Sequence, residues 1–198
     1  LSLGSSKHPW IWKGHRLELL AERALWDPLQ RTLLVADLHL GKAELFQAHG
    51  VALPSDGDAA SLNALLELAH RFLPEQVVVL GDLIHGRVGI TAELRQKLVA
   101  LPELLGCPLR LIDGNHERGS WLEGLRREPS CALGPLWLSL GPNPDQTISI
   151  FAATCILWRW WAMGPTDCGC PASPIGEGAI EEAVARTANN WCCLPSVP

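Results

Sequence analysis

Three short apolar runs constrain the fold of this 198-residue chain more than any other feature. They cover residues 33–36, 77–80 and 109–112, and they consist mostly of leucine, isoleucine and valine. Such runs are typical of parallel strands that are buried on both faces. Between them, leucines recur at helical spacing over 58–72 and 91–105, which predicts two amphipathic helices. The alternation predicts an α/β fold with a parallel sheet and right-handed crossovers.

Residue types that bind metals follow each of these runs. They are Asp37 and His39 in D-x-H, Asp82 and His85 in G-D-x-x-H, and Asn115 and His116 in G-N-H-E. Because the carboxyl ends of parallel strands meet at one edge of a sheet, we expect these side chains to lie close together. Carboxylate, amide and imidazole groups suit a pair of divalent metal ions, which can clamp a phosphoryl group. A single aspartate in a loop is usually a turn or cap residue, but three such clusters after three strands predict a site.

Charge and hydropathy limit the other classes of function. The net charge of −5 provides no overall basic field for nucleic acid, so any such contact would be local. The beginning of the chain lacks a charged segment followed by an apolar one, and no apolar run approaches the ~18 residues of a membrane span. We therefore expect a cytoplasmic protein without a membrane partner.

The three motifs resemble those of the calcineurin-like metallophosphoesterases. The local sequence of residues 22–25 and 31–42 further resembles that of the bacterial PdeM branch, the ligase-associated DNA damage response endonucleases. The resemblance covers roughly residues 15–139. It implies a metallophosphoesterase-type α/β/β/α sandwich that binds two divalent metal ions, Mn²⁺ first, with Fe, Zn or Mg as alternatives. It also implies a phosphodiester substrate, DNA included, and repair partners such as a ligase or a helicase.

The resemblance also implies roles for individual residues. Asp37 and His39 would bind one metal ion, while Asp82 would bridge both ions. Asn115 would bind the second ion, and His116 would protonate the leaving alkoxide or steady the phosphate. His85 and Lys42 are candidates for contact with the substrate phosphate, although Lys42 is equally well explained as a solvated surface lysine.

Three functions fit these residues. The first is a phosphodiesterase, as a DNA endonuclease or exonuclease linked to repair. The second is a hydrolase of small nucleotides or pyrophosphates at the same site, and the third is an inactive remnant that acts only as a binding module. The sequence offers no base-stacking platform and no basic stripe, so the assignment to DNA rests on the resemblance alone.

The last part of the chain departs from the family pattern. That pattern needs further histidines, including a G-H-x-H, yet no histidine follows His116. From about residue 140 the α/β pattern gives way to clusters of tryptophan and cysteine at 158–161, 168–170 and 191–193. The cysteine spacings do not fit the usual zinc-binding pairs.

A shifted reading frame explains this departure. A frame that starts at the third base of each codon permits C-G-H-L-H-P-V-A-L-V-G-D-G-P over 151–165, which restores the G-H-x-H. Loss of one base near the codon of Leu140 would produce the shift. We therefore interpret 1–14 as an irregular leader, 15–139 as the core and 140–198 as an out-of-frame tail. This interpretation predicts an incomplete second sheet, a marginally folded chain and little or no activity.

Overall fold

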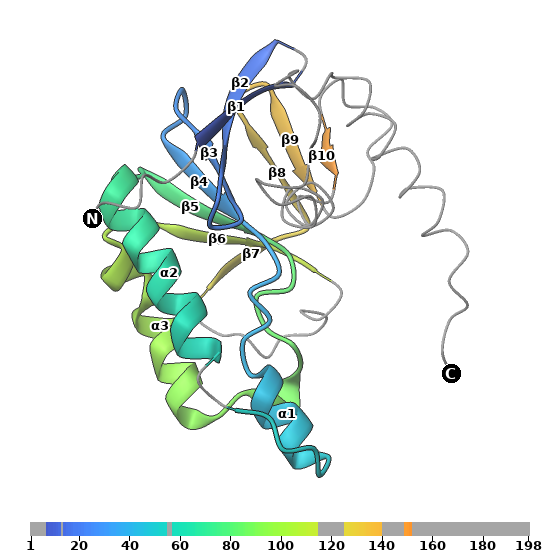
Figure 1. Ribbon diagram of the computed structural model, residues 1–198. Coiled ribbons are helices and arrows are strands. Elements are labelled where there is room, and N and C mark those ends of the chain that lie inside the picture. Colours follow the sequence, from blue (N-terminus) through green and yellow to red (C-terminus); the bar gives the residue numbers. More distant parts are fainter. Residues whose placement is uncertain (1–6, 13, 55–56, 115–124, 140–148, 152–198) are drawn as a thin grey trace, which may run out of the picture.

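The computed structural model describes residues 7–12, 14–54, 57–114, 125–139 and 149–151. Their elements are β1 (Lys7–Trp12), β2 (His15–Leu20), β3 (Ala24–Asp27), β4 (Thr32–Val35), α1 (Lys42–Ala48), α2 (Gly57–Phe72), β5 (Gln76–Leu80), the 3₁₀ turn η1 (Arg87–Gly89), α3 (Ala92–Leu105), β6 (Leu109–Ile112), β7 (Arg126–Glu128), β8 (Ser130–Leu133), β9 (Leu136–Ser139) and β10 (Ser149–Phe151). The strands form a seven-stranded sheet in the order β1-β2-β3-β4-β5-β6-β7 and a three-stranded sheet in the order β10-β9-β8 (Figure 1).

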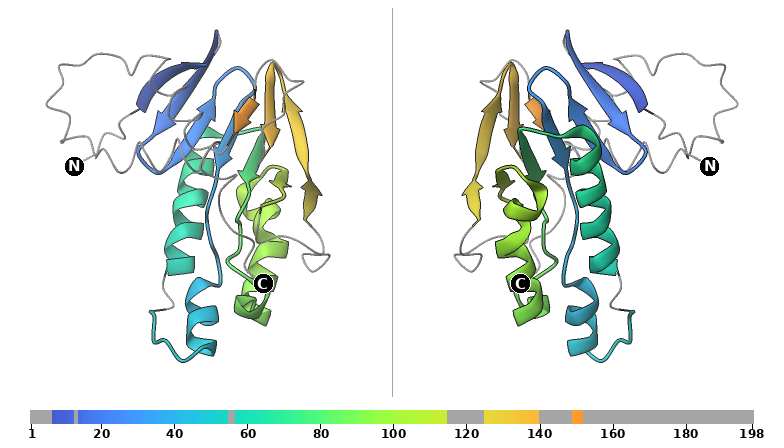
Figure 2. Two further views of the ribbon diagram at one scale, coloured as in Figure 1. Left: turned by 90° about the vertical axis from the view of Figure 1, so that its right-hand side faces the viewer. Right: turned by 90° about the vertical axis from the view of Figure 1, so that its left-hand side faces the viewer.

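The large sheet has an antiparallel half and a parallel half. Strands β1 to β4 form an antiparallel meander, whereas β4, β5, β6 and β7 pair in parallel. The parallel half contains the three predicted strands, and helices α2 and α3 cover one of its faces (Figure 2). The predicted α/β class is therefore confirmed.

Alternate residues of the central strands serve two separate cores. On β4, Leu33 and Val35 lie in the core that includes the leucines of α2 and α3. Leu34, between them, lies in the second core together with Leu136 and Leu138 of the small sheet. Successive side chains of a strand point to opposite faces, so this one strand is covered by helices on one side and by a sheet on the other. The described residues thus form three layers, α, β and β, of the predicted α/β/β/α sandwich.

The small sheet covers the inner face of the large one in the described part of the chain. Strands β8 and β9 form an antiparallel hairpin, and β10 adds to β9 in parallel. Leu34 and Leu138, on the two facing sheets, are fully buried. Strand β10 falls within the segment 140–198 that we interpret as out of frame, and the rest of that segment lies outside the described residues. The predicted incompleteness of this sheet therefore stays a prediction.

The predicted irregular leader over residues 1–14 is wrong for Lys7–Trp12. These residues form the edge strand β1, which pairs with β2 along its whole length. Trp10 is buried whereas the neighbouring Ile11 is exposed, as expected of a strand with one covered face. The strand contains Pro9, which is tolerated because an edge strand has one side that needs no ladder hydrogen bond.

The two predicted helices are confirmed to within one residue at each end. Helix α3 begins after Thr91, whose hydroxyl accepts a hydrogen bond from the backbone N–H of Leu94, and it ends at Gly106 with a φ of 69°. A capping hydroxyl and a left-handed glycine are the usual signals for the two ends of a helix. None of the helices in the described ranges is both long enough and apolar enough to cross a membrane.

Candidate metal centre

Two adjacent loops bring the first predicted site residues together. Asp37 and His39 lie after β4, and Asp82 lies after the neighbouring parallel strand β5. The loops stay paired beyond the sheet: the backbone N–H of His39 donates to the carbonyl of Asp82 at 3.0 Å, and that of His85 donates to the carbonyl of Leu40 at 2.8 Å. The backbone therefore fixes the relative position of the two loops.

The backbone at the three site residues adopts a rare conformation. The φ angles are 53° at Asp37, 46° at His39 and 52° at Asp82, all in the left-handed region. For residues other than glycine this conformation costs on the order of 1 kcal/mol or more, and it persists only where the surrounding structure enforces it. Three such residues at one edge of a sheet are typical of a functional site.

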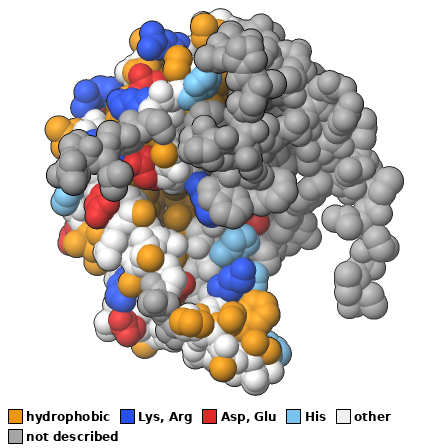
Figure 3. Space-filling model, in the orientation of Figure 1, with side chains coloured by type: hydrophobic (Ala, Val, Ile, Leu, Met, Phe, Trp, Pro, Cys, Tyr) orange, Lys and Arg blue, Asp and Glu red, His pale blue; other side chains and the backbone are white. Residues whose placement is uncertain are grey.

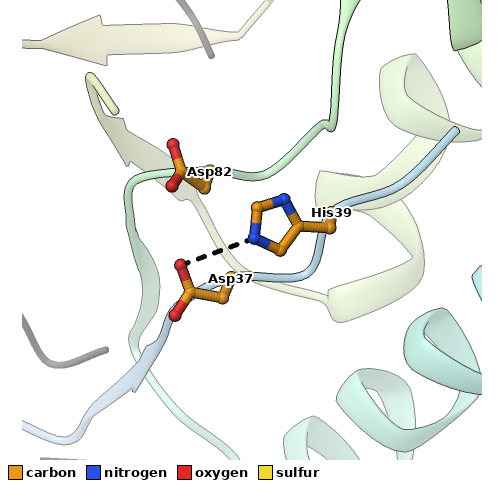
Figure 4. A group of neighbouring side chains, drawn as sticks. All are labelled: Asp37, His39 and Asp82. Atoms are coloured by element: carbon orange, nitrogen blue, oxygen red, sulfur yellow. Dashed lines mark ion pairs between the residues drawn. The ribbon is translucent and has the colours of Figure 1, made fainter. Parts of the chain in front are cut away.

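The three side chains converge on one point. A ligand atom from each of Asp37, His39 and Asp82 lies within 4.8 Å of the other two (Figure 4). The Nε2 atom of His39 is 3.9 Å from Oδ1 of Asp37, and both side chains are partly open to solvent. Two carboxylates and one imidazole fit a divalent ion such as Mn²⁺, Fe²⁺ or Zn²⁺ by donor type. The expected proximity of these residues is therefore observed, and they form a candidate metal site, while their roles as ligands stay predictions.

The third motif is described only at its beginning. Strand β6 ends at Ile112, and Asn115 and His116 lie outside the described residues, so their roles stay predictions. The carboxylate of Asp113 accepts a hydrogen bond from Nε of Arg127 at 2.9 Å. This contact ties Asp113 to the neighbouring strand β7, and Asp113 is not part of the cluster found among the described residues.

The two candidate phosphate contacts occupy different positions. Lys42 is the first residue of α1 and is exposed to solvent. The Nδ1 atom of His85 lies 3.2 Å from Nδ1 of His39, so His85 contacts a site residue directly. Histidine and cationic side chains gather at the surface beside α1 (Figure 3). Phosphate contact by either residue stays a prediction.

Two contacts that stabilise the loop after β4 were not predicted from the sequence. The carboxylate of Asp58, at the start of α2, accepts a hydrogen bond from the backbone N–H of Gly41 at 2.6 Å. Burial raises the pKa of the Asp58 carboxyl, although the hydrogen bond from Gly41 acts in the opposite direction. Gly89 of η1 packs directly against the backbone of Gly41. In the sequence, Asp58 looks like an ordinary acid in the first turn of a helix, and Gly89 like an ordinary turn residue.

Comparison with known proteins agrees with this geometry. The family model described as calcineurin-like phosphoesterase matches residues 30–152. Among solved structures, the nuclease MPE of Pseudomonas putida superposes with a TM-score of 0.57 at 29% sequence identity, covering 72% of this chain and 70% of that one. No curated protein matches the chain. Because the family model spans more than half of the sequence and the cluster holds metal-binding residue types, the chain belongs to the calcineurin-like phosphoesterases, which are metal-dependent hydrolases of phosphoester bonds.

Proposed function

We propose that this protein descends from metal-dependent phosphodiesterases that cut DNA, as endonucleases or exonucleases in repair, and that the chain as written is impaired. The observation that carries the phosphodiesterase assignment is the convergence of Asp37, His39 and Asp82 within 4.8 Å. The similarity to a nuclease supports a polynucleotide substrate rather than a small phosphate ester. A cytoplasmic location and repair partners such as a ligase or a helicase belong to the same proposal.

Each site residue has a distinct task in this proposal. Asp37 and His39 would hold one ion, Asp82 would serve both ions, and Asn115 would serve the second. Divalent metals, with Mn²⁺ as the first choice, supply Lewis acidity at a phosphoryl oxygen and make a water more acidic.

Other residues act on the substrate itself. His116 gives a proton to the leaving alkoxide, which otherwise departs as a poor leaving group. His85 and Lys42 donate hydrogen bonds to the oxygens of the phosphate, where negative charge accumulates during the reaction.

The impairment follows from the composition of the tail. No histidine follows His116, so the chain lacks the later imidazoles of the family pattern. The match to the family model also ends at residue 152, near the beginning of the segment that reads better in a shifted frame. Missing ligands lower metal affinity, and even the loss of a supporting group costs roughly 10–100-fold.

The experiment compares two purified proteins, the chain as written and the chain with one base restored near the codon of Leu140. Both are assayed with Mn²⁺ and bis-p-nitrophenyl phosphate. We expect the restored protein to hydrolyse the substrate and to lose this activity in Asp82→Ala, whereas the chain as written should be at least ~100-fold slower.

The possible results separate the hypotheses. Robust turnover by the chain as written, abolished by Asp82→Ala, would contradict the impairment. A restored protein that binds two metal ions yet hydrolyses no phosphodiester would contradict the phosphodiesterase assignment. Comparison of a single-stranded oligonucleotide with a nucleoside pyrophosphate tests the alternative hydrolase, and a metal content far below two ions in both proteins would favour a binding module.

A further inference from the structure

Three aromatic rings from three different segments form a row that leads away from the metal centre. The ring of His39 meets that of His85 edge-on, with centroids 5.2 Å apart and an interplanar angle of 70°. The ring of His85 in turn stacks on that of Phe46, with centroids 5.8 Å apart and an angle of 24°. His39 follows β4, His85 follows β5 and Phe46 belongs to α1, so the row joins elements that are distant in the sequence.

The position of His39 decides which of its nitrogens carries the proton. Its Nε2 atom faces Asp37 and the ligand cluster (Figure 4). A nitrogen that binds a metal must offer a lone pair, so the proton of the neutral ring lies on the other nitrogen, Nδ1. That nitrogen is 3.2 Å from Nδ1 of His85.

The contact between the two imidazoles then has a fixed direction. Because Nδ1 of His39 donates, Nδ1 of His85 must accept, and the proton of a neutral His85 lies on Nε2. Ligand histidines usually donate their second N–H to a neighbouring acceptor, which orients the ring and increases its basicity as a ligand. Here an imidazole takes the place that a carboxylate or a carbonyl oxygen usually occupies.

Phe46 is held firmly enough to support His85. Helix α1, which carries it, begins at the tight backbone contact between Gly41 and Gly89. Leu45, beside Phe46, packs so closely on Gly86 that a Cβ atom there would lie 2.7 Å from its Cδ1 atom. The segment after His85 and the helix that carries Phe46 are therefore packed together, and the face of the phenyl ring limits rotation of the His85 ring.

We infer that Phe46 and His85 are positioning residues for the metal centre: Phe46 holds the ring plane in which His85 accepts the Nδ1–H of His39, and this keeps Nε2 of His39 directed at the metal. The inference rests on the proposed metal function.

The test measures Zn²⁺ affinity by calorimetry on the full chain, because Zn²⁺ is diamagnetic and also permits ¹⁵N NMR of the histidine rings. Phe46→Leu removes the flat ring but keeps most of the volume, and Phe46→Tyr keeps the ring. Phe72→Leu is the matched control, since Phe72 is also partly buried and contacts another ring, that of Trp26, at a tilt of 42° with centroids 5.0 Å apart.

We expect Phe46→Leu to weaken Zn²⁺ binding roughly 10-fold, within the range observed for groups that orient metal ligands. Phe46→Tyr and Phe72→Leu should bind as the unmodified chain does. His85→Leu should weaken binding similarly, whereas His85→Asn, whose side-chain oxygen can accept from His39, should retain most of the affinity. In the zinc-bound chain, ¹⁵N shifts should show the proton of His39 on Nδ1 and that of His85 on Nε2.

Three results would overturn the inference. One is equal Zn²⁺ affinity of Phe46→Leu and the unmodified chain, and another is a His39 that carries its proton on Nε2 with zinc bound. The third is a loss of affinity in Phe72→Leu as large as that in Phe46→Leu, which would indicate a general effect on folding. If neither the unmodified chain nor the protein with the restored reading frame bound Zn²⁺, the metal site itself would be overturned, and the inference with it.

Discussion

Gly41 and Gly89 meet backbone to backbone, and no side chain fits between them. A Cβ atom at Gly89 would overlap the carbonyl oxygen of Gly41, and one at Gly41 would lie 2.6 Å from the carbonyl oxygen of Gly89. We expect Gly89→Ala to destabilise the fold by about 1–3 kcal/mol, the usual cost of overpacking, and to weaken metal binding because the loop that carries His39 must shift. Urea unfolding measures the first effect and calorimetry the second.

Gly57→Ala provides the control for this prediction. A Cβ atom at Gly57 meets nothing within 4 Å, and its backbone lies at the start of α2. Alanine there should be neutral or stabilising by up to ~1 kcal/mol, since it restricts the unfolded chain. If Gly89→Ala proved as stable as Gly57→Ala, close contact between the two glycines would not be a constraint in solution.

The contribution of Asp58 to the stability of the fold depends on pH. Burial raises the pKa of its carboxyl in the folded state, and the neighbouring Glu44 acts in the same direction. The folded protein therefore keeps the proton at a pH where the unfolded chain has lost it, so this residue lowers stability as pH rises from the ordinary pKa of aspartate towards the raised one. The hydrogen bond from Gly41 offsets part of that loss.

Asp58→Asn should remove this dependence while its amide oxygen still accepts from Gly41. The stability of the variant relative to the unmodified chain should increase as pH rises through that window and then level off. Thermal melts of both proteins across the acidic range measure the difference, in which all other titrating groups cancel. A relative stability that falls with rising pH would show that the carboxylate is favoured in the fold.

At the scale of elements, a charged cluster fixes the parallel pair β6 and β7. The carboxylate of Glu128 on β7 accepts a hydrogen bond from Arg110 on β6 at 2.6 Å and another from Arg126 on its own strand. The hydrogen bond from Arg110 lowers the pKa of Glu128. A lowered pKa contributes stability above the ordinary pKa of glutamate, and this contribution is lost as pH falls through the lowered value.

Glu128→Gln should therefore cost on the order of 1 kcal/mol at neutral pH and almost nothing in strong acid, given the partial exposure of the pair. Chemical denaturation at both pH values measures the cost. Glu67→Gln, on the exposed face of α2, is the control and should change stability little at either pH. An equal cost at both pH values would show that packing, not charge, joins the two strands.

The sequence pattern predicted some elements well and others not at all, for physical reasons. The run 77–80 is apolar throughout because β5 is covered on both faces, so it was recognisable. Strand β7 reads Arg126, Arg127, Glu128, without an apolar period, and it joins the sheet through backbone pairing with β6 and a charged contact between Arg110 and Glu128. Burial leaves a pattern in the sequence, whereas a charged pairing does not.

The same division applies to the site. Asp37, His39 and Asp82 were predictable because strand ends fix where they lie. Phe46 was not, since an aromatic residue in a short helix carries no sign of the ring on which it stacks. Such contacts join residues far apart in the chain, and only the packing of α1 against the loops brings them together.

At the scale of the whole molecule, the two cores share one sheet. We therefore expect the structure formed by residues 140–198 to affect the stability of both cores. Leu34 and Leu138 are fully buried where the two sheets face each other, and β10 extends the small sheet with residues from the segment that we interpret as out of frame. If the restored reading frame supplies further strands and helices, the restored protein should bury more surface on folding. Its unfolding by urea should then have a steeper denaturant dependence as well as a higher midpoint, because this slope scales with the surface exposed on unfolding.

The measurement is urea unfolding of both proteins without metal, monitored by circular dichroism. Excluding metal matters, because an ion bound only by the folded state would raise the midpoint of the restored protein by mass action alone. A higher midpoint with an unchanged slope would mean that the tail adjusts contacts without adding folded structure. Equal slopes and equal midpoints would contradict the view that the natural continuation of the chain completes this fold, and the tail as written would then have to be accepted as a native part of the protein.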